Sequence, residues 1–186
     1  MKCTMDGLGI NVISGIDGSF KQFNDNILPL LNIDHIRYFA YDRCKTFKNN
    51  LQDIIEAFST SVPSKEIVIG WSIGAVMAAF LSERVHVEKY VMINTFYDRR
   101  EVLSKREIEC DEDVCINDIK THNNQYILIY GERDGKIPPE DNKKVFEHLK
   151  KNNHVTIIPF KNAEHCIASF QPNELASIIN NILKED

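Results

Sequence analysis

The sequence lacks the long apolar runs and the excess of basic residues that mark membrane-spanning and nucleic-acid-binding proteins. None of its hydrophobic stretches approaches the ~20 consecutive apolar residues that a transmembrane helix needs. Its 186 residues carry a formal net charge of -5, whereas binding a phosphate backbone requires a net basic face. We therefore expect neither a membrane nor a nucleic acid as a partner.

The cysteines form no recognisable pattern. The five of them are Cys3, Cys44, Cys110, Cys115 and Cys166. An odd number, in a chain whose first residues form no apolar signal core, indicates reduced thiols and a cytoplasmic location. Cys110 and Cys115 are too far apart for a Cys-x-x-Cys knuckle, and no paired His or Cys cluster lies nearby, so we expect no metal site.

What the sequence does have is enough hydrophobic residues for a core and a regular alternation of segment types. Because 43% of the residues are hydrophobic and no repeat or linker interrupts them, we expect a single domain spanning residues 1–186. Short apolar segments predict strands at residues 9–14, 35–41, 66–70, 89–94, 125–130 and 155–160. Amphipathic segments predict helices at residues 20–31, 50–59, 73–84, 140–151 and 173–184. This alternation predicts an α/β fold, with a mostly parallel six-stranded sheet and helices on both faces.

One segment between a predicted strand and a predicted helix carries a chemical pattern, Gly70-Trp71-Ser72-Ile73-Gly74. In a G-x-S-x-G turn the serine lies at a strained strand-to-helix junction, and the glycines on either side let strand and helix approach closely. The N-terminus of the helix directs its N–H groups at the site, which favours developing negative charge. We therefore predict Ser72 as a nucleophile, with N-capping of the helix as its alternative role.

Residues that could activate this serine follow later strands. Asp134 comes after the fifth predicted strand, and His165 comes after the sixth. In such sheets ligands bind outside the carboxyl ends of the strands, so these side chains are expected at one edge with Ser72. His165 would then remove the proton of Ser72, and Asp134 would orient the imidazole ring.

Each of these assignments has a plainer alternative. Asp134 has local competitors in Glu132 and Asp141, and it could instead serve only in a turn. Asp98, after the fourth predicted strand, is a second candidate for the acid. His165 could be a histidine of a surface loop, although it is the only one of six histidines that follows the last predicted strand.

Three motifs together resemble the α/β-hydrolase superfamily over nearly the whole chain. They are the Gly-x-Ser-x-Gly turn, Tyr-Gly-Glu-Arg-Asp-Gly-Lys-Ile-Pro at residues 130–138 and Asn-Ala-Glu-His at residues 162–165. The order serine, aspartate, histidine along the chain is also that of this superfamily. Trp71, the Asp134-Gly135 pair and the segment after His165 are similar to the pimeloyl-carrier-protein methyl ester esterases of biotin synthesis. This resemblance implies a serine hydrolase that needs no metal or organic cofactor.

The chain departs from the family pattern in two places. Family members usually carry His-Gly after the first shared strand, where this sequence has Ser14-Gly15. The resemblance nevertheless implies that the N–H groups of Ile16 and Ile73 hold the oxyanion. Larger relatives insert a helical cap before the acid, whereas the variable segment 98–124 leaves room for little or no cap and at most a short lid.

The most basic part of the chain, residues 98–107, lies in this variable segment. Its plain interpretation is a solvated helix face with ion pairs between residues four apart. The alternative is a lid in which Arg99, Arg100 or Arg106 meets a substrate carboxylate or an acidic carrier protein. Trp71 likewise has two roles open to it, packing in the core or lining an acyl pocket.

These observations predict a serine carboxylesterase or thioesterase that acts through Ser72, His165 and Asp134 and forms an acyl-enzyme. Its most specific form hydrolyses the methyl ester of a pimeloyl-acyl-carrier protein. A general short-acyl esterase or thioesterase is the alternative, so the expected substrate is a small acyl ester or a carrier-linked acyl group. A third hypothesis, from a different class, is a hydrolase-fold binding or signalling module with an idle triad, although a complete set of three residues argues against it.

Overall fold

The computed structural model describes residues 8–16, 19–33, 35–59, 65–104, 112–121 and 123–184. Its strands are β1 (Leu8–Ile13), β2 (His35–Phe39), β3 (Lys65–Trp71), β4 (Lys89–Ile93), β5 (Gln125–Gly131) and β6 (His154–Phe160). They form one sheet in the order β2-β1-β3-β4-β5-β6, and every neighbouring pair is parallel. The predicted six-stranded sheet is confirmed, and it is parallel throughout.

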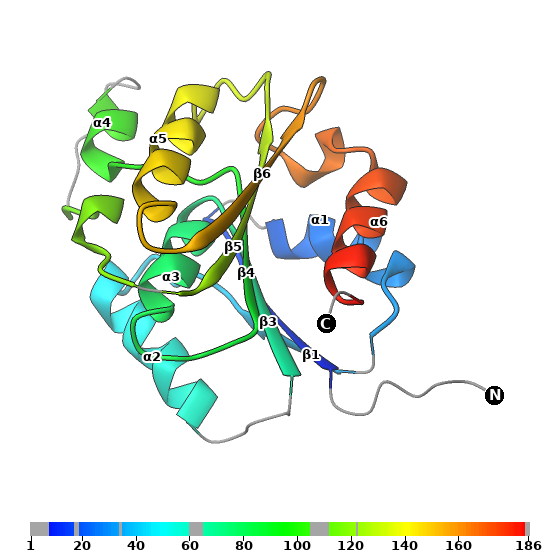
Figure 1. Cartoon of the computed structure of the whole chain (residues 1–186), viewed down its shortest axis with the longest axis horizontal. Helices are drawn as coiled ribbons and strands as arrows, with labels where there is room; N and C mark the ends of the chain where they lie inside the picture. Colours follow the sequence, from blue (N-terminus) through cyan, green and yellow to red (C-terminus); the bar gives the residue numbers. More distant parts are fainter. Residues whose placement is uncertain are drawn as a thin grey trace.

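Helices cover both faces of the sheet, as the sequence predicts. They are α1 (Ser19–Asn26), α2 (Phe47–Ser59), α3 (Ile73–Leu81), α4 (Arg99–Ser104), α5 (Pro139–Leu149) and α6 (Pro172–Ile182). Figure 1 shows α1 and α6 on one side of the sheet, and α2, α3, α4 and α5 on the other. Along the described part of the chain, no helix combines the length and the hydrophobicity that crossing a membrane requires.

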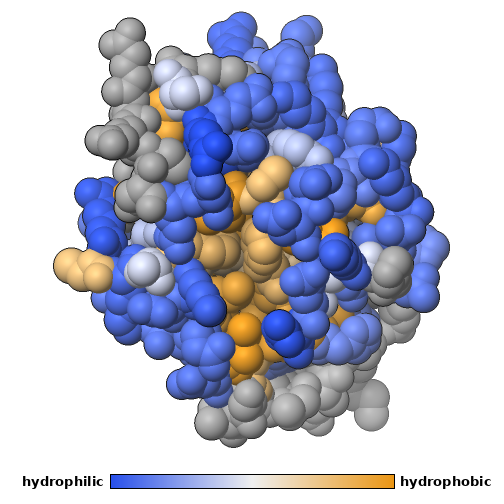
Figure 2. Space-filling view, turned by 90° about the vertical axis from the view of Figure 1, so that its left-hand side faces the viewer, coloured by the Kyte–Doolittle hydropathy of each residue, from blue (hydrophilic) through white to orange (hydrophobic). Residues whose placement is uncertain are grey.

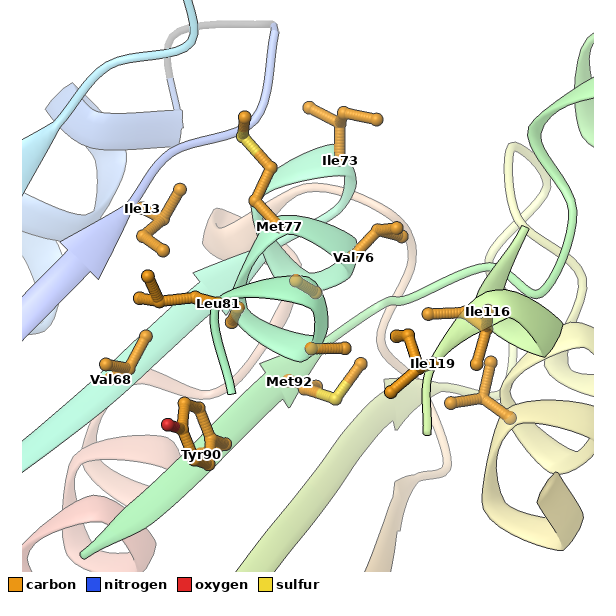
Figure 3. Packing of buried hydrophobic residues seen from close by; sticks show 14 of the residues in the cluster. Ile13, Val68, Ile73, Val76, Met77, Leu81, Tyr90, Met92, Ile116 and Ile119 are labelled. Carbon is orange, nitrogen blue, oxygen red and sulfur yellow. The ribbon is translucent and has the colours of Figure 1, made fainter. Parts of the chain in front are cut away.

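Two hydrophobic clusters, one on each face, hold these layers together. Successive residues of a strand point to opposite faces, so Tyr90 and Met92 of β4 pack toward α3 (Figure 3). Val91 and Ile93 belong to the other cluster and pack toward α1 and α6. All residues of β4 are buried, which is typical of a central parallel strand. The side of the molecule that carries α2 to α5 also has hydrophobic side chains in its centre, ringed by hydrophilic ones (Figure 2).

The helix that follows the G-x-S-x-G turn is buried nearly all round. Every residue of α3 except Phe80 is buried, because the helix lies between the sheet and α2. A helix with this pattern cannot shift without opening the core, so the turn at its N-terminus is held on a rigid support.

All five predicted helices differ from the observed ones at their ends; the helix expected at 73–84, for example, ends at Leu81. For two of these differences the structure gives the reason. The helix expected at residues 20–31 ends at Asn26 and continues only as a 3-10 turn, η1 (Leu28–Leu30), because Pro29 lacks the N–H of the helical ladder. The helix expected at 50–59 begins earlier, at Phe47. Its first N–H groups donate to the carboxylate of Glu112, at 2.6 Å from Phe47 and 3.5 Å from Lys48.

The variable segment 98–124 contributes α4 and a 3-10 turn, η2 (Ile116–Asp118), in its described part. Residues 105–111 and 122, and with them Arg106, lie outside the described residues. An antiparallel bridge between Asp98 and Cys115 draws the two sides of this segment together. The described part is thus a short helix and a turn rather than a full cap.

Candidate active site

Ser72 lies at the tip of the turn between β3 and α3. Its φ of 55° and ψ of -119° place it in a sparsely populated backbone region that costs a non-glycine residue about 1–3 kcal/mol. By position Ser72 is the N-cap of α3, yet its side chain makes no capping hydrogen bond. The alternative role as an N-cap is therefore not used, and the half-buried hydroxyl has no partner among the described residues.

The two glycines of the turn allow a close approach that any side chain would block. A Cβ atom added at Gly70 would lie 2.3 Å from the carbonyl oxygen of Gly74. One added at Gly74 would lie 2.2 Å from the carbonyl oxygen of Ile13 and 2.7 Å from that of Ser14. The start of α3 therefore rests directly on the end of β1, which brings Ser72 beside the loop that follows β1.

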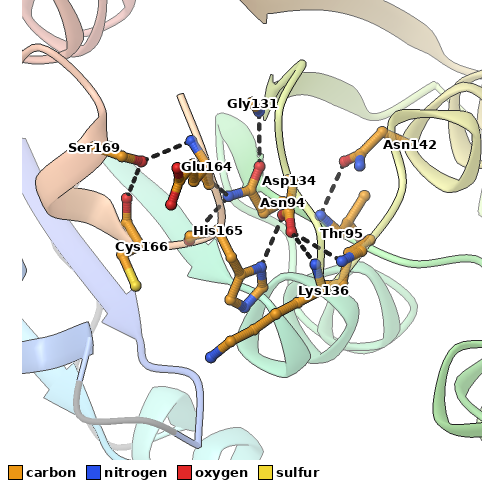
Figure 4. Close-up of polar contacts among 11 residues, drawn as sticks. Asn94, Thr95, Gly131, Asp134, Lys136, Asn142, Glu164, His165, Cys166 and Ser169 are labelled. Atoms are coloured by element: carbon orange, nitrogen blue, oxygen red, sulfur yellow. Dashed lines mark hydrogen bonds and ion pairs between the residues drawn. The ribbon is translucent and has the colours of Figure 1, made fainter. Parts of the chain in front are cut away.

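Asp134 and His165 meet at the same edge of the sheet (Figure 4). The Oδ2 atom of Asp134 lies 2.8 Å from Nδ1 of His165, and the aspartate is only 4% exposed. The other carboxylate oxygen, Oδ1, accepts the N–H groups of Lys136 and Ile137 at 2.8 and 2.9 Å. One oxygen thus fixes the carboxylate, and the other receives the Nδ1–H of the ring. The ring's Nε2, which has no partner among the described residues, is then left as a base.

The other candidate carboxylates are engaged elsewhere. Asp98 accepts two backbone N–H groups of the first turn of α4, at 2.8 and 3.3 Å, and so caps that helix. Asp141 is buried in the first turn of α5, 3.7 Å from the ammonium group of Lys144. Glu132 is exposed. Of the candidate acids, Asp134 is the one that the structure brings to His165.

The two backbone N–H groups predicted to hold the oxyanion belong to Ile73 and Ile16. Ile73 is the first residue of α3, so its N–H is among the N-terminal groups that have no partner within the helix. Ile16 follows β1, its side chain is 37% exposed, and its carbonyl oxygen accepts a hydrogen bond from Arg43 at 2.9 Å. That hydrogen bond anchors the loop after β1, which the close approach at Gly74 places against the G-x-S-x-G turn.

Potential metal ligands and reactive thiols are dispersed over the part of the chain that the structure describes. No three His, Cys, Asp or Glu side chains within it gather as metal ligands do. The described cysteines, Cys44, Cys115 and Cys166, are free, and Cys3 and Cys110 lie outside the described residues. Burial raises the pKa of the Cys115 thiol, so this cysteine is a neutral packing residue near neutral pH.

No family model and no curated protein matches this sequence. Solved structures do match. A truncated carbohydrate esterase from gut microbiota superposes with a TM-score of 0.74 at 13% identity, covering 99% of this chain and 88% of that one. The esterase domain of a Rhodothermus marinus protein gives 0.64 at 13%, with 97% and 89% covered. Acyl-protein thioesterase 2 of Zea mays gives 0.62 at 14%, with 98% and 96% covered.

The chain has the α/β-hydrolase fold. Identities of 13–14% establish a shared fold, and the activity has to be inferred from the site itself. In the α/β-hydrolase fold the nucleophile, acid and base stand on turns after separate strands, and Ser72, Asp134 and His165 follow β3, β5 and β6 in this chain.

Trp71, directly before the serine in this α/β-hydrolase fold, packs in the core. It is 5% exposed, and its ring meets that of Phe170 edge to face, with 5.4 Å between the centroids. Both rings belong to the cluster under α1 and α6. Of the two candidate roles of Trp71, the structure shows packing in the core.

The arginines of the variable segment face carboxylates of their own chain. Arg99 is 12% exposed in its side chain and lies 3.6 Å from Glu112, and Arg100 pairs with Asp113. These ion pairs connect α4 to the segment that contains Glu112 and Asp113. The plain sequence interpretation instead expects ion pairs within one helix. The structure brings neither arginine into contact with Ser72, Asp134 or His165 among the described residues.

Sequence reasoning missed one buried residue of this candidate site, Asn94. It follows β4 with a φ of 48°, and its side chain bonds the backbone near both Asp134 and His165. The only signal in the sequence is an asparagine at the end of a strand that carries no charged residue after Lys89, on the edge where Ser72, Asp134 and His165 also lie.

Proposed function

We propose that this protein is a serine hydrolase that cleaves carboxylic esters or thioesters through an acyl-enzyme. The observation that carries the proposal is Ser72, a strained serine with an unbonded hydroxyl at the same sheet edge as a buried Asp–His pair. Backbone strain of this kind persists where the surrounding structure enforces it, and it clusters at active sites. The names of the structural neighbours, two esterases and a thioesterase, support the same reaction class.

In the first step, Nε2 of His165 accepts the hydroxyl proton of Ser72 while Oγ attacks the acyl carbon. The π electrons of the carbonyl move to its oxygen, which the N–H groups of Ile73 and Ile16 receive. A donor of this kind contributes about 3 kcal/mol to the transition state. No Ser72–His165 hydrogen bond forms among the described residues, and such bonds tighten in the substrate complex.

In the second step, the tetrahedral intermediate expels an alkoxide or a thiolate, and the imidazolium of His165 returns its proton to that leaving group. Asp134 stabilises the imidazolium while the proton resides there. Water, deprotonated by the same Nε2, then attacks the acyl-enzyme. The second tetrahedral intermediate expels Oγ of Ser72, which takes the proton back from His165, and the carboxylic acid is released. Both steps use one base and one oxyanion site, so no additional group is required.

The proposal covers esters and thioesters of short acyl groups. The narrower form, a methyl ester on a pimeloyl-acyl-carrier protein, stays a prediction. It rests on the resemblance of Trp71, the Asp134-Gly135 pair and the segment after His165, and its lid version rests on Arg99, Arg100 or Arg106. In the structure Trp71 packs in the core, and Arg99 and Arg100 face carboxylates of their own chain.

A fluorophosphonate probe, which phosphonylates activated serines, tests the proposal. We expect labelling of the wild-type protein, with the modified peptide carrying Ser72, and no labelling of Ser72→Ala. Ser82→Ala is the matched control, because Ser82 is a buried serine whose hydroxyl is already bonded to Ala79 and Tyr126. Unlabelled wild type is assayed with p-nitrophenyl acetate and an acetyl thioester, and we expect labelling to abolish that activity.

Two results would contradict this proposal. A folded wild-type protein that takes up no probe would favour the binding-module hypothesis. Labelling of Ser72→Ala equal to that of the wild type would show that the probe reacts elsewhere. Circular dichroism of each variant establishes that it is folded.

A further inference from the structure

Asn94 stands at the centre of the carboxyl edge of the sheet. It directly follows β4, which lies between β3 and β5, and none of its surface is exposed. Its φ of 48° is in the left-handed region, which asparagine adopts more readily than other residues with a Cβ atom. Figure 4 shows its side chain among the segments that bear Asp134 and His165.

Every polar group of the Asn94 side chain bonds the backbone of those two segments. Its Oδ1 accepts the N–H of Gly131 at 2.9 Å. Its Nδ2 donates to the carbonyl oxygens of Glu164 and His165, at 3.2 and 3.0 Å. Gly131 in turn accepts the N–H of Asp134 at 3.3 Å. One buried amide therefore joins the turn that holds the acid to the loop that holds the base.

The residue before Asn94 connects the same strand to the nucleophile. The carbonyl oxygen of Ile93 accepts the N–H of Ser72 at 2.9 Å. Two consecutive residues, Ile93 at the end of β4 and Asn94 after it, therefore bond the backbone of all three segments that carry Ser72, Asp134 and His165. This arrangement is stiff, because every residue of β4 is buried and the strand cannot move independently of its neighbours.

We propose that Asn94 is a positioning residue that fixes the separation of Asp134 and His165, an inference that rests on the proposed serine hydrolase activity. The loop with His165 follows β6, an edge strand, so it is tied to the rest of the sheet on one side only. Asn94 supplies a tie from the middle of the sheet. Without it the loop shifts relative to Asp134, and a displacement of about 1 Å in such a site lowers the rate by about 10²-fold.

Asn153 offers a matched control at the opposite end of the sheet. Its Oδ1 accepts the N–H of Asn124 at 3.1 Å, and its Nδ2 donates to the carbonyl oxygens of Thr121 and Leu149 at 3.1 and 2.9 Å. The bonding pattern is the same as that of Asn94, one backbone N–H and two carbonyls. None of the groups that Asn153 bonds belongs to the segments of Ser72, Asp134 or His165.

The test compares Asn94→Ala, Asn94→Gly and Asn153→Ala. Glycine keeps the left-handed backbone of position 94 without strain, so it isolates the loss of the side chain. We expect both Asn94 variants to lose kcat about 10²-fold with KM within about twofold of wild type, and Asn153→Ala to keep its kcat. We expect all three variants to melt at a lower temperature than wild type. If Asn94 had only a structural role, its variants would lose stability but keep the same kcat as Asn153→Ala.

A second readout does not depend on turnover. The Nδ1 proton shared by His165 and Asp134 gives a far-downfield proton resonance, since it lies in a charge-assisted hydrogen bond. We expect this resonance in the wild type and in Asn153→Ala, and its loss or broadening in Asn94→Gly. A folded Asn94→Gly protein with wild-type kcat and an unchanged resonance would overturn the inference. If the wild type neither turns over esters nor reacts with the probe, the proposed function fails, and the resonance alone decides the role of Asn94.

Discussion

The two ends of the parallel sheet are built from similar polar side chains, and they differ in what those side chains leave unbonded. At the amino end, the hydroxyl of Tyr126 lies 2.5 Å from Ser82 and 2.9 Å from Thr121, and burial raises its pKa. At the carboxyl end, the hydroxyl of Ser72 and Nε2 of His165 have no partner among the described residues.

A second amino-end group follows the same pattern. Arg37 of β2 contacts Glu66 and Asn11, and its guanidinium lies over the ring of Phe58, 4.7 Å from the centroid. Burial raises the pKa of Glu66, while the positive charge of Arg37 opposes that shift. Groups satisfied in this way contribute to stability, whereas the unsatisfied groups of the other end are available to a substrate.

The largest expected effect is on kcat and comes from a substitution at the carboxyl end of the sheet. Asp134→Asn presents an amide to Nδ1 of His165, which favours the wrong ring tautomer, and we expect kcat to fall about 10⁴-fold with little change in melting temperature. Ester hydrolysis and thermal unfolding measured on the same preparation check this.

Asp98→Asn is the control for that substitution, because Asp98 is the other candidate acid and caps α4 instead. We expect its kcat to stay within about twofold and its stability to fall by at most about 1 kcal/mol. The reverse ranking of the two variants would move the acid to Asp98.

The next effect concerns stability at the amino end. Arg37→Ala leaves the carboxylate of Glu66 buried without its counterion, and we expect a loss of about 3 kcal/mol near neutral pH with kcat unchanged. Urea unfolding at several pH values measures it. Lys21→Ala, which removes one partner of an exposed pair, should leave the free energy of unfolding essentially unchanged.

The pH dependence of this loss has a definite sign. Without Arg37 the pKa of Glu66 rises further, and a carboxyl group with a raised folded pKa loses stability as pH rises from its ordinary value of 4.5 through the folded value. The deficit of Arg37→Ala should therefore be smallest below pH 4.5 and grow above it. A deficit that shrinks as pH rises would show that Glu66 is not its cause.

The smallest expected effect is a change in the free energy of unfolding, which measures the backbone strain at Ser72. Ser72→Gly relaxes the backbone at φ 55°, and we expect it to abolish esterase activity while raising the free energy of unfolding by about 1 kcal/mol. Asn123→Gly, at φ 61° near the amino end, should change stability by less than about 0.5 kcal/mol because asparagine tolerates that region. Equal gains at both positions would mean that Ser72 carries no special strain.

Local patterns were enough to predict the order of strands and helices and the G-x-S-x-G turn, because both depend on neighbours in sequence. Pro29 was a local signal for a helix end, and the prediction of one continuous helix at residues 20–31 did not use it. The start of α2 was readable only in part. Thr46 caps it locally, because its hydroxyl accepts the N–H of Asn49 at 3.1 Å, whereas the contact with Glu112 comes from far along the chain. Likewise, several carboxylates follow strands in the sequence, and only the fold reveals that Asp134 is the one beside His165.

By itself, then, the sequence determined the α/β alternation, the parallel sheet and the candidates Ser72, Asp134 and His165, because side-chain periodicity and glycine spacing act over a few residues. Tertiary structure decided the acid among its competitors, the burial of Trp71 and the partners of Arg99 and Arg100. It also brought Asn94 between two segments more than thirty residues away, at Gly131 and His165. Hydrogen bonds of that range join segments whose proximity exists only once the sheet has formed.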